Sequence, residues 1–150
     1  MSNRYLDKHS LYGPLIQEPA DKHMFLSIVI PCYNESFLTD TLDSLYACTP
    51  SRLPAEVLVV INSAKNDNEA IKRNNETEAA FDQWLRLHVT ERLRFHKIIK
   101  NDLEPKHAGV GLARKIGMDE AVRMFESIHE KDGVIVCLDA DCTVSKNYLT

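Results

Sequence analysis

Four apolar runs, separated by longer stretches of mixed polarity, dominate the chain between residues 24 and 138. They are MFLSIVI (24–30), EVLVVI (56–61), LRFHKII (93–99) and VIVCL (134–138). The first, second and fourth are nearly continuous in apolar residues, many of them β-branched, which predicts strands buried on both faces. The third alternates between apolar and polar residues and also predicts a strand. Pro31 is expected to end the first strand.

Helical patterns fill the segments between these strands. Apolar residues recur at helical spacing in residues 36–47, in a segment that ends at about Thr90, and in residues 108–128. Ser36 is a candidate N-cap for the first of these helices. The expected buried stripes are Phe37, Leu38, Thr41, Leu42 and Leu45; Ala80, Phe81, Trp84, Leu85 and His88; and Met118, Val122 and Phe125.

The third helix carries a second pattern. Ala113, Gly117 and Ala121 repeat every four residues, so small side chains share one face of the helix. Such a face lets a helix approach a sheet closely.

The alternation of strands and helices predicts an α/β fold with right-handed crossovers and a mostly parallel sheet flanked by helices. Residues 24–150 would form this unit, and residues 1–23 an irregular arm broken by Pro14 and Pro19. The last residues, TVSKNYLT, resemble a helix start with Ser145 as N-cap. A one-turn helix is unstable alone, so we expect the natural protein to continue beyond Thr150.

Composition narrows the class of protein. A hydrophobic content of 44%, a charged content of 27% and a formal charge of −4 suit a globular chain and give no support for nucleic-acid binding. No apolar stretch approaches the ~20 residues that span a bilayer, and the N-terminus lacks the apolar core of a signal peptide. We expect a cytoplasmic location with reduced cysteines, and the cytoplasmic face of a membrane as the alternative for the full-length protein.

Ligands of open α/β sheets bind beyond the carboxyl ends of the strands. That rule selects PCYNE (31–35), NSAKND (62–67) and DADC (139–142), which should converge on one crevice. In an extended chain Asp139 and Asp141 point the same way, and two such carboxylates can hold Mg²⁺ or Mn²⁺ together with substrate phosphates. The alternative is that both acids only cap the turn that follows.

The other segments supply candidate contacts to a nucleoside. Tyr33 offers a ring face and a hydroxyl, and Asn34 and Glu35 can fix a turn or accept from a ribose or base. Asn62 presents an amide that could pair with a base edge. Each also has a structural alternative, as a packing or turn residue.

The helix that begins near Gly109 adds cations. Arg114 and Lys115 lie in its first turns, where a helix N-terminus favours an anionic ligand. The alternative is that both side chains form a solvated face or contacts at the sheet edge.

Together these segments resemble a known family. LSIVIPCYNE, an apolar second strand, GVGLARKIGMDEA and VCLDADC are similar, in order and separation, to the nucleotide-binding half of family-2 glycosyltransferases. The resemblance covers residue 26 to residue 150 and implies the Rossmann-like GT-A fold.

The resemblance also implies an activity and its residues. It implies an inverting transfer of a sugar from a nucleotide-diphosphate donor, assisted by Mn²⁺ or Mg²⁺. Pro31, Tyr33 and Glu35 would line the base and ribose. Asp139 would approach the ribose or the metal, and Asp141 would be the principal metal ligand.

Three departures from the family qualify this expectation. Asn62 replaces an aspartate that contacts the base, NSAKND replaces an acidic Gly-Ser loop, and Lys115 replaces an asparagine. The family's general base and acceptor-binding elements lie beyond the D-x-D motif. The base is therefore expected past Thr150, the acceptor (saccharide, lipid or other) is open, and residues 1–150 alone should not transfer sugar.

Two other functions compete with this one. LDADCT also fits the D-x-D-x-T motif of haloacid-dehalogenase-like phosphatases, with Asp139 as nucleophile and Asp141 as acid/base. That motif ordinarily follows the first strand of its domain, and it leaves PCYNE unexplained. The chain could also bind nucleotide without activity. A sheet cut short would expose apolar surface, which favours self-association.

Overall fold

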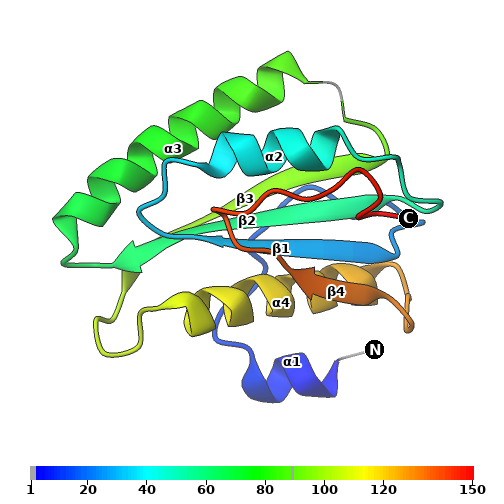
Figure 1. Cartoon of the computed structure of the whole chain (residues 1–150). Helices are drawn as coiled ribbons and strands as arrows, with labels where there is room; N and C mark the ends of the chain where they lie inside the picture. Colours follow the sequence, from blue (N-terminus) through cyan, green and yellow to red (C-terminus); the bar gives the residue numbers. More distant parts are fainter. Residues whose placement is uncertain (1–2, 89) are drawn as a thin grey trace.

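One parallel sheet forms the centre of the molecule (Figure 1). The structure, a computed structural model, describes residues 3–88 and 90–150. In this part of the chain the strands are β1 (Leu26–Cys32), β2 (Ala55–Ala64), β3 (Leu93–Leu103) and β4 (Val134–Cys137), in the spatial order β3-β2-β1-β4. Every neighbouring pair is parallel. The predicted α/β fold with a Rossmann-like sheet is confirmed.

Helices cover both faces of the sheet. Figure 1 shows α2 (Leu38–Tyr46) and α3 (Asn68–Leu87) on one face, and α4 (Val110–Ser127) on the other, with α1 (Arg4–His9) outside α4. Alternate β1 residues serve the two faces, since Ile28 and Ile30 belong to the core under α2 and α3, whereas Val29 belongs to the core under α4. Burial on both faces explains the nearly continuous apolar runs.

The small-residue face of α4 behaves as predicted. Ala113, Gly117 and Ala121 are all buried. A methyl group at Gly117 would lie 2.3 Å from Val29 Cγ1 and 3.0 Å from Val60 Cγ2, so the helix backbone lies directly on the sheet. Only glycine permits this approach.

Several details of the helices differ from expectation. The first residue of α2 is Leu38, and its N-cap is Phe37 without a side-chain bond; Ser36 is not the cap. The Glu35 carboxylate accepts the Phe37 N–H at 2.9 Å, just before the helix begins. The prediction was also wrong for Phe37, Ala80 and Met118, which are exposed. The buried residues of α3 are Ala70, Asn74, Thr77, Phe81 and Trp84.

The N-terminal segment is more ordered than an irregular arm. It contains α1, whose N-cap Asn3 accepts the Leu6 N–H at 3.1 Å. Further along, the backbone N–H groups of Leu15 and Ile16 donate to the buried carboxylate of Glu120. Residues 3–23 therefore belong to the same folded unit as the sheet.

The segment after β4 forms turns rather than the predicted helix start. The Tyr148 N–H donates to Ser145 O at 3.0 Å, and the Thr150 N–H donates to Asn147 O at 3.2 Å. The segment returns along the α2 face (Figure 1), where Leu149 is buried in the core. Burial of this side chain and the bond from Thr49 N to Lys146 O hold the segment against the end of α2.

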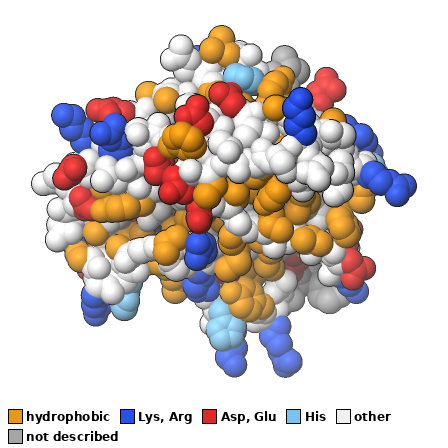
Figure 2. All heavy atoms as spheres, in the orientation of Figure 1, with side chains coloured by type: hydrophobic (Ala, Val, Ile, Leu, Met, Phe, Trp, Pro, Cys, Tyr) orange, Lys and Arg blue, Asp and Glu red, His pale blue; other side chains and the backbone are white. Residues whose placement is uncertain are grey.

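β4 is an edge strand with exposed side chains at Val134 and Cys137. Figure 2 shows hydrophobic side chains gathered over this strand. Self-association through this surface stays a prediction. Within the residues that the structure describes, no helix combines the length and the apolar character needed to cross a bilayer.

Candidate functional site

The carboxyl ends of the parallel strands lie at one edge of the sheet, on the left in Figure 1. The last β1–β4 pair is Val29 with Cys137, and two residues further along each chain are Pro31 and Asp139. The prediction that Pro31 ends β1 was wrong. Pro31 pairs with Val60 inside the strand. Its missing N–H cannot extend the ladder to β4, which explains why β4 leaves the sheet at this level.

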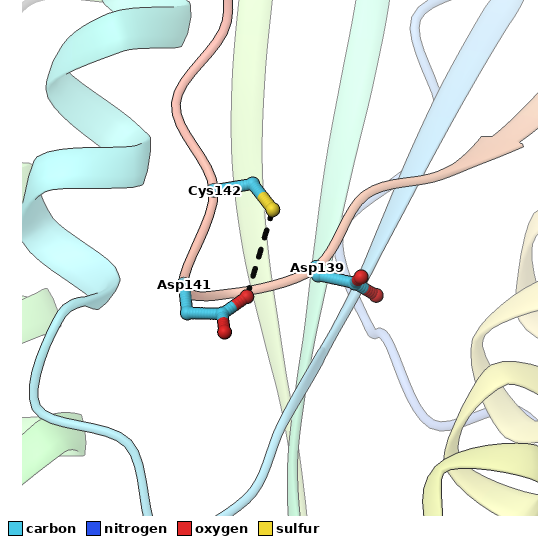
Figure 3. A group of neighbouring side chains, drawn as sticks. All are labelled: Asp139, Asp141 and Cys142. Carbon is cyan, nitrogen blue, oxygen red and sulfur yellow. Dashed lines mark hydrogen bonds between the residues drawn. The ribbon is translucent and has the colours of Figure 1, made fainter.

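The acidic segment that follows β4 is a turn. The Cys142 N–H donates to Asp139 O at 3.1 Å, so the backbone is not extended. The prediction from extended geometry, that the two carboxylates point the same way, was therefore wrong. In Figure 3 the Asp141 carboxylate and the Cys142 thiol face each other, whereas the Asp139 carboxylate is directed toward α4. Ligand atoms of all three exposed residues still lie within 4.8 Å of one another.

Helix α2 holds this turn in place. Between the two aspartates, Ala140 is buried, and its carbonyl accepts the Thr41 hydroxyl at 2.8 Å. One turn later on the helix, the Ser44 hydroxyl accepts the Val144 N–H at 3.1 Å. The acids are thus exposed on a backbone that is anchored from beneath.

Arg114 is the cation nearest to the acids. It lies in the second turn of α4, and its Nη2 donates to Asp139 Oδ1 at 3.1 Å. Its buried Nε has no hydrogen-bond partner among the described residues. The N-cap of α4 is Gly109, whose φ of 152° favours glycine, and open space surrounds it. Arg114 therefore makes a contact at the sheet edge, which was the predicted alternative to binding an anionic ligand. Lys115 instead pairs with Asp119 at 2.8 Å.

The donor set suits a hard divalent cation better than a soft one. Two carboxylates are the ligands that Mg²⁺ and Mn²⁺ prefer. Desolvation, followed by the hydrogen bond to Asp141, raises the pKa of the Cys142 thiol.

Tyr33 follows β1 at this end of the sheet. The residue is 53% exposed, and its hydroxyl donates to Asp67 Oδ2. Asp67 is the N-cap of α3 and accepts the Ala70 N–H through Oδ1 at 3.1 Å. The bond raises the pKa of Tyr33 and lowers that of Asp67. Sequence reasoning did not single out Asp67, although an aspartate just before a helical pattern is a typical N-cap.

Asn34 and Glu35 form the turn predicted for them. Asn34 has a φ of 47°, in the left-handed region that asparagine tolerates. Its N–H donates to Asn74 Oδ1 at 3.0 Å. The Glu35 carbonyl accepts the Thr77 hydroxyl at 2.7 Å, and its carboxylate accepts the Phe37 N–H.

Asn62 is part of the sheet rather than of its surface. Its side chain is 2% exposed, and Nδ2 donates to Cys32 O and to Val60 O, both at 3.1 Å. Because both neighbouring atoms are carbonyl oxygens, the end of the amide that faces them must be the Nδ2 donor. The donor end is therefore committed to backbone carbonyls, and only Oδ1 remains for another partner.

Asn74 was missed by sequence reasoning. It is fully buried on α3, and its Nδ2 donates to Asn62 O at 2.9 Å and to Asn101 Oδ1 at 2.8 Å. These bonds tie the helix to the ends of β2 and β3. The available signal was a polar residue on the helical stripe that contains Ala70 and Phe81.

A scan against protein-family models and a search of curated proteins both found no match for this chain. The assignment of function therefore depends on the chemistry of the site. The exposed carboxylates of Asp139 and Asp141 are able to hold a divalent cation, and the Arg114 guanidinium beside Asp139 is able to contact an anion.

Proposed function

We propose that this chain is the donor-binding part of a glycosyltransferase similar to family 2, and that it binds a nucleoside diphosphate sugar together with Mn²⁺ or Mg²⁺. The observation that supports this most directly is the exposed pair Asp139 and Asp141 at the end of β4, with ligand atoms within 4.8 Å. An acidic pair on an anchored turn, at the edge where α/β sheets bind ligands, is suited to a cation–diphosphate complex.

The metal side of the proposed site consists of Asp141 and Asp139. The bound cation would neutralise the diphosphate and stabilise the charge that it gains as a leaving group. Arg114 holds Asp139 at 3.1 Å in the structure. When Asp139 turns to the cation, the guanidinium is released beside the open N-terminus of α4, where it can donate to phosphate oxygens.

The nucleoside side consists of the loop after β1 and the end of β2. The exposed ring of Tyr33 offers a stacking face for a base, and Asn34 and Glu35 shape the turn beside it. Pro31 is buried and would form the floor of this region rather than its rim. Asn62 would offer a base an acceptor only, because its donor end is bonded to the sheet.

Deprotonation of the acceptor hydroxyl is assigned to no residue of this chain. We assign no general base and no acceptor site among residues 1–150, so binding rather than transfer is the activity that we propose for this chain. The acceptor is a saccharide, a lipid or another hydroxyl compound. We place the site in the cytoplasm, in accord with four unpaired cysteines in the structure.

Calorimetric titration with UDP and with GDP, in Mn²⁺ and in EDTA, tests the proposal. We expect one of the two nucleotides to bind in Mn²⁺, and at least tenfold weaker binding in EDTA or in Asp141→Ala. Asp141→Asn, which retains the shape of the side chain but not its charge, should show the same loss. Ser145→Ala, on the same exposed segment, is the control and should bind as the wild type does.

Two outcomes would overturn the proposal. Nucleotide binding that is indifferent to Mn²⁺ and to Asp141→Ala would remove the acidic pair from the ligand site. A beryllofluoride adduct at Asp139, without affinity for either nucleotide, would favour the phosphatase alternative.

A further inference from the structure

Each of the three residues that follow β1 is held by α3 or by its N-cap. The bonds join Tyr33 Oη to Asp67 Oδ2, Asn34 N to Asn74 Oδ1 at 3.0 Å, and Thr77 Oγ1 to Glu35 O at 2.7 Å. The partners are the N-cap Asp67 and the α3 residues Asn74 and Thr77. Their spacings of seven and three residues place them on one face of the helix. One helix face therefore determines the path of residues 33–35.

Asn74 is the central member of this face. Because it is fully buried, its amide would be costly without partners, and it has three. Oδ1 accepts the N–H of Asn34 in the loop after β1. Nδ2 donates to the carbonyl of Asn62, near the end of β2, and to the side chain of Asn101 on β3. A single side chain thus aligns the loop after β1 with the ends of the two adjacent strands.

The acidic turn has a different support. Thr41 and Ser44 of α2 bond to Ala140 O and Val144 N, on either side of Asp141 and Cys142. Within the described residues, no side-chain hydrogen bond joins α3 to residues 139–142. The bond between Trp84 of α3 and Asp43 of α2 joins the two helices but involves neither loop.

We infer that the candidate site is positioned in two separate halves, the nucleoside side by α3 and the metal side by α2. Asn74 and Thr77 are then positioning residues for nucleoside binding, and Thr41 is a positioning residue for metal binding. The identity of the two ligands rests on the proposed function, whereas the division of the scaffold rests on the hydrogen bonds alone.

Thr77→Val and Thr41→Val form a matched pair that tests this inference. Both residues are buried, and each donates one bond to one backbone carbonyl, at 2.7 and 2.8 Å. Both substitutions keep the side-chain shape and remove only the hydroxyl. A general loss of stability would affect both variants alike, so opposite effects on two ligands identify positioning.

Binding of Mn²⁺ alone is measured by electron paramagnetic resonance. Binding of uridine and of guanosine, each in EDTA, is measured by ligand-observed NMR. We expect Thr77→Val to weaken nucleoside binding by roughly tenfold and to leave Mn²⁺ binding within about twofold. Thr41→Val should show the reverse. Asn74→Ala should follow the pattern of Thr77→Val with a larger loss. Equal weakening of both ligands in both threonine variants would overturn the inference and leave the proposed function intact.

Hydrogen exchange supplies a readout that needs no ligand. Thr77→Val should speed amide exchange in residues 33–36 without affecting residues 139–144, and Thr41→Val should do the opposite. If this division appears and the wild type binds neither Mn²⁺ nor a nucleoside, the proposed function and the ligand roles of these residues fail, while the division of the scaffold between α3 and α2 stands. Faster exchange in both segments for each variant would contradict the inference itself.

Discussion

The bond between Tyr33 and Asp67 couples two ionisable groups at the candidate site. Because the phenol donates to the carboxylate, the bond favours the neutral tyrosine and the charged aspartate. The pKa of Tyr33 is accordingly raised and that of Asp67 lowered. Both groups keep these forms at neutral pH, and the ring of Tyr33 remains half exposed for another partner.

Removing this hydroxyl should alter the acid titration of the site. In Tyr33→Phe we expect the pKa of Asp67 to rise toward its ordinary value of 3.8, measured by carbon NMR of the carboxyl group. The lowered pKa of Asp67 contributes stability that is present above pH 3.8 and is lost as the pH falls through the folded-state pKa. The variant should therefore lose less stability on acidification than the wild type.

Tyr5→Phe is the control for this titration. Its hydroxyl donates to another carboxylate, Asp119, at 2.8 Å, so Asp67 should titrate as in the wild type. An unchanged Asp67 titration in Tyr33→Phe would show that the Ala70 N–H, rather than the phenol, lowers its pKa.

Among the elements, α4 makes the closest approach to the sheet. Its small-residue face brings the helix backbone onto Val29 of β1 and Val60 of β2. The same helix carries Arg114 toward Asp139 at its first turns and receives the N-terminal segment on its outer side. A change in the distance between α4 and the sheet would therefore affect both the core and the placement of Arg114.

Gly117→Ala tests this close contact. The added methyl group would lie 2.3 Å from Val29 Cγ1, so the helix or the valine must shift. We expect the free energy of unfolding to fall by about 1–3 kcal/mol, measured by urea denaturation. Gly111→Ala is the matched control, because its methyl group meets nothing within 4 Å and helix propensity should make the change neutral or stabilising. A stable Gly117→Ala protein would mean that α4 lies further from the sheet.

On the scale of the whole molecule, the N-terminal segment completes the hydrogen bonding of two buried carboxylates. Glu120 accepts two backbone N–H groups from it, and Glu56, on β2, accepts the Asp21 N–H at 3.0 Å. Glu56 is also paired with His96 at 2.7 Å and Arg94 at 3.2 Å. A buried carboxylate that loses such partners lowers the free energy of unfolding. The segment is therefore an integral layer of the fold.

Deleting residues 1–23 should destabilise the protein by more than the loss of its apolar contacts alone. Glu56 and Glu120 would each lose donors, at about 1–3 kcal/mol per unsatisfied group, so we expect a loss of roughly 3 kcal/mol or more in urea denaturation. Deleting only residues 1–9 removes α1 but leaves both carboxylates satisfied, and should cost clearly less. Equal losses from the two deletions would show that α1, not the carboxylate bonds, joins the segment to the core.

Local patterns predicted the fold well but the site only in part. Periodicity located the four strands that the structure describes and the helices α2, α3 and α4 between them, and the small residues of α4 predicted its approach to the sheet. The helix start predicted after β4 was wrong. The turn at Asn34 also followed from residue type. Pro31 was misplaced because strand pairing with β2 tolerates a proline whose missing N–H faces the other neighbour. Asp139 and Asp141 were assigned a shared direction because β4 was expected to remain extended.

The order of strands and helices was determined by the sequence itself, since burial on one or two faces imposes a period that short segments already display. The tertiary structure alone decided which polar side chains meet: Asp67 with Tyr33, Asn74 with three strand ends, and Arg114 with Asp139. These partners lie 12 to 40 residues apart in the chain. The distances between these side chains depend on how each helix packs on the sheet, and the local periodicity of the sequence gives no information about that packing.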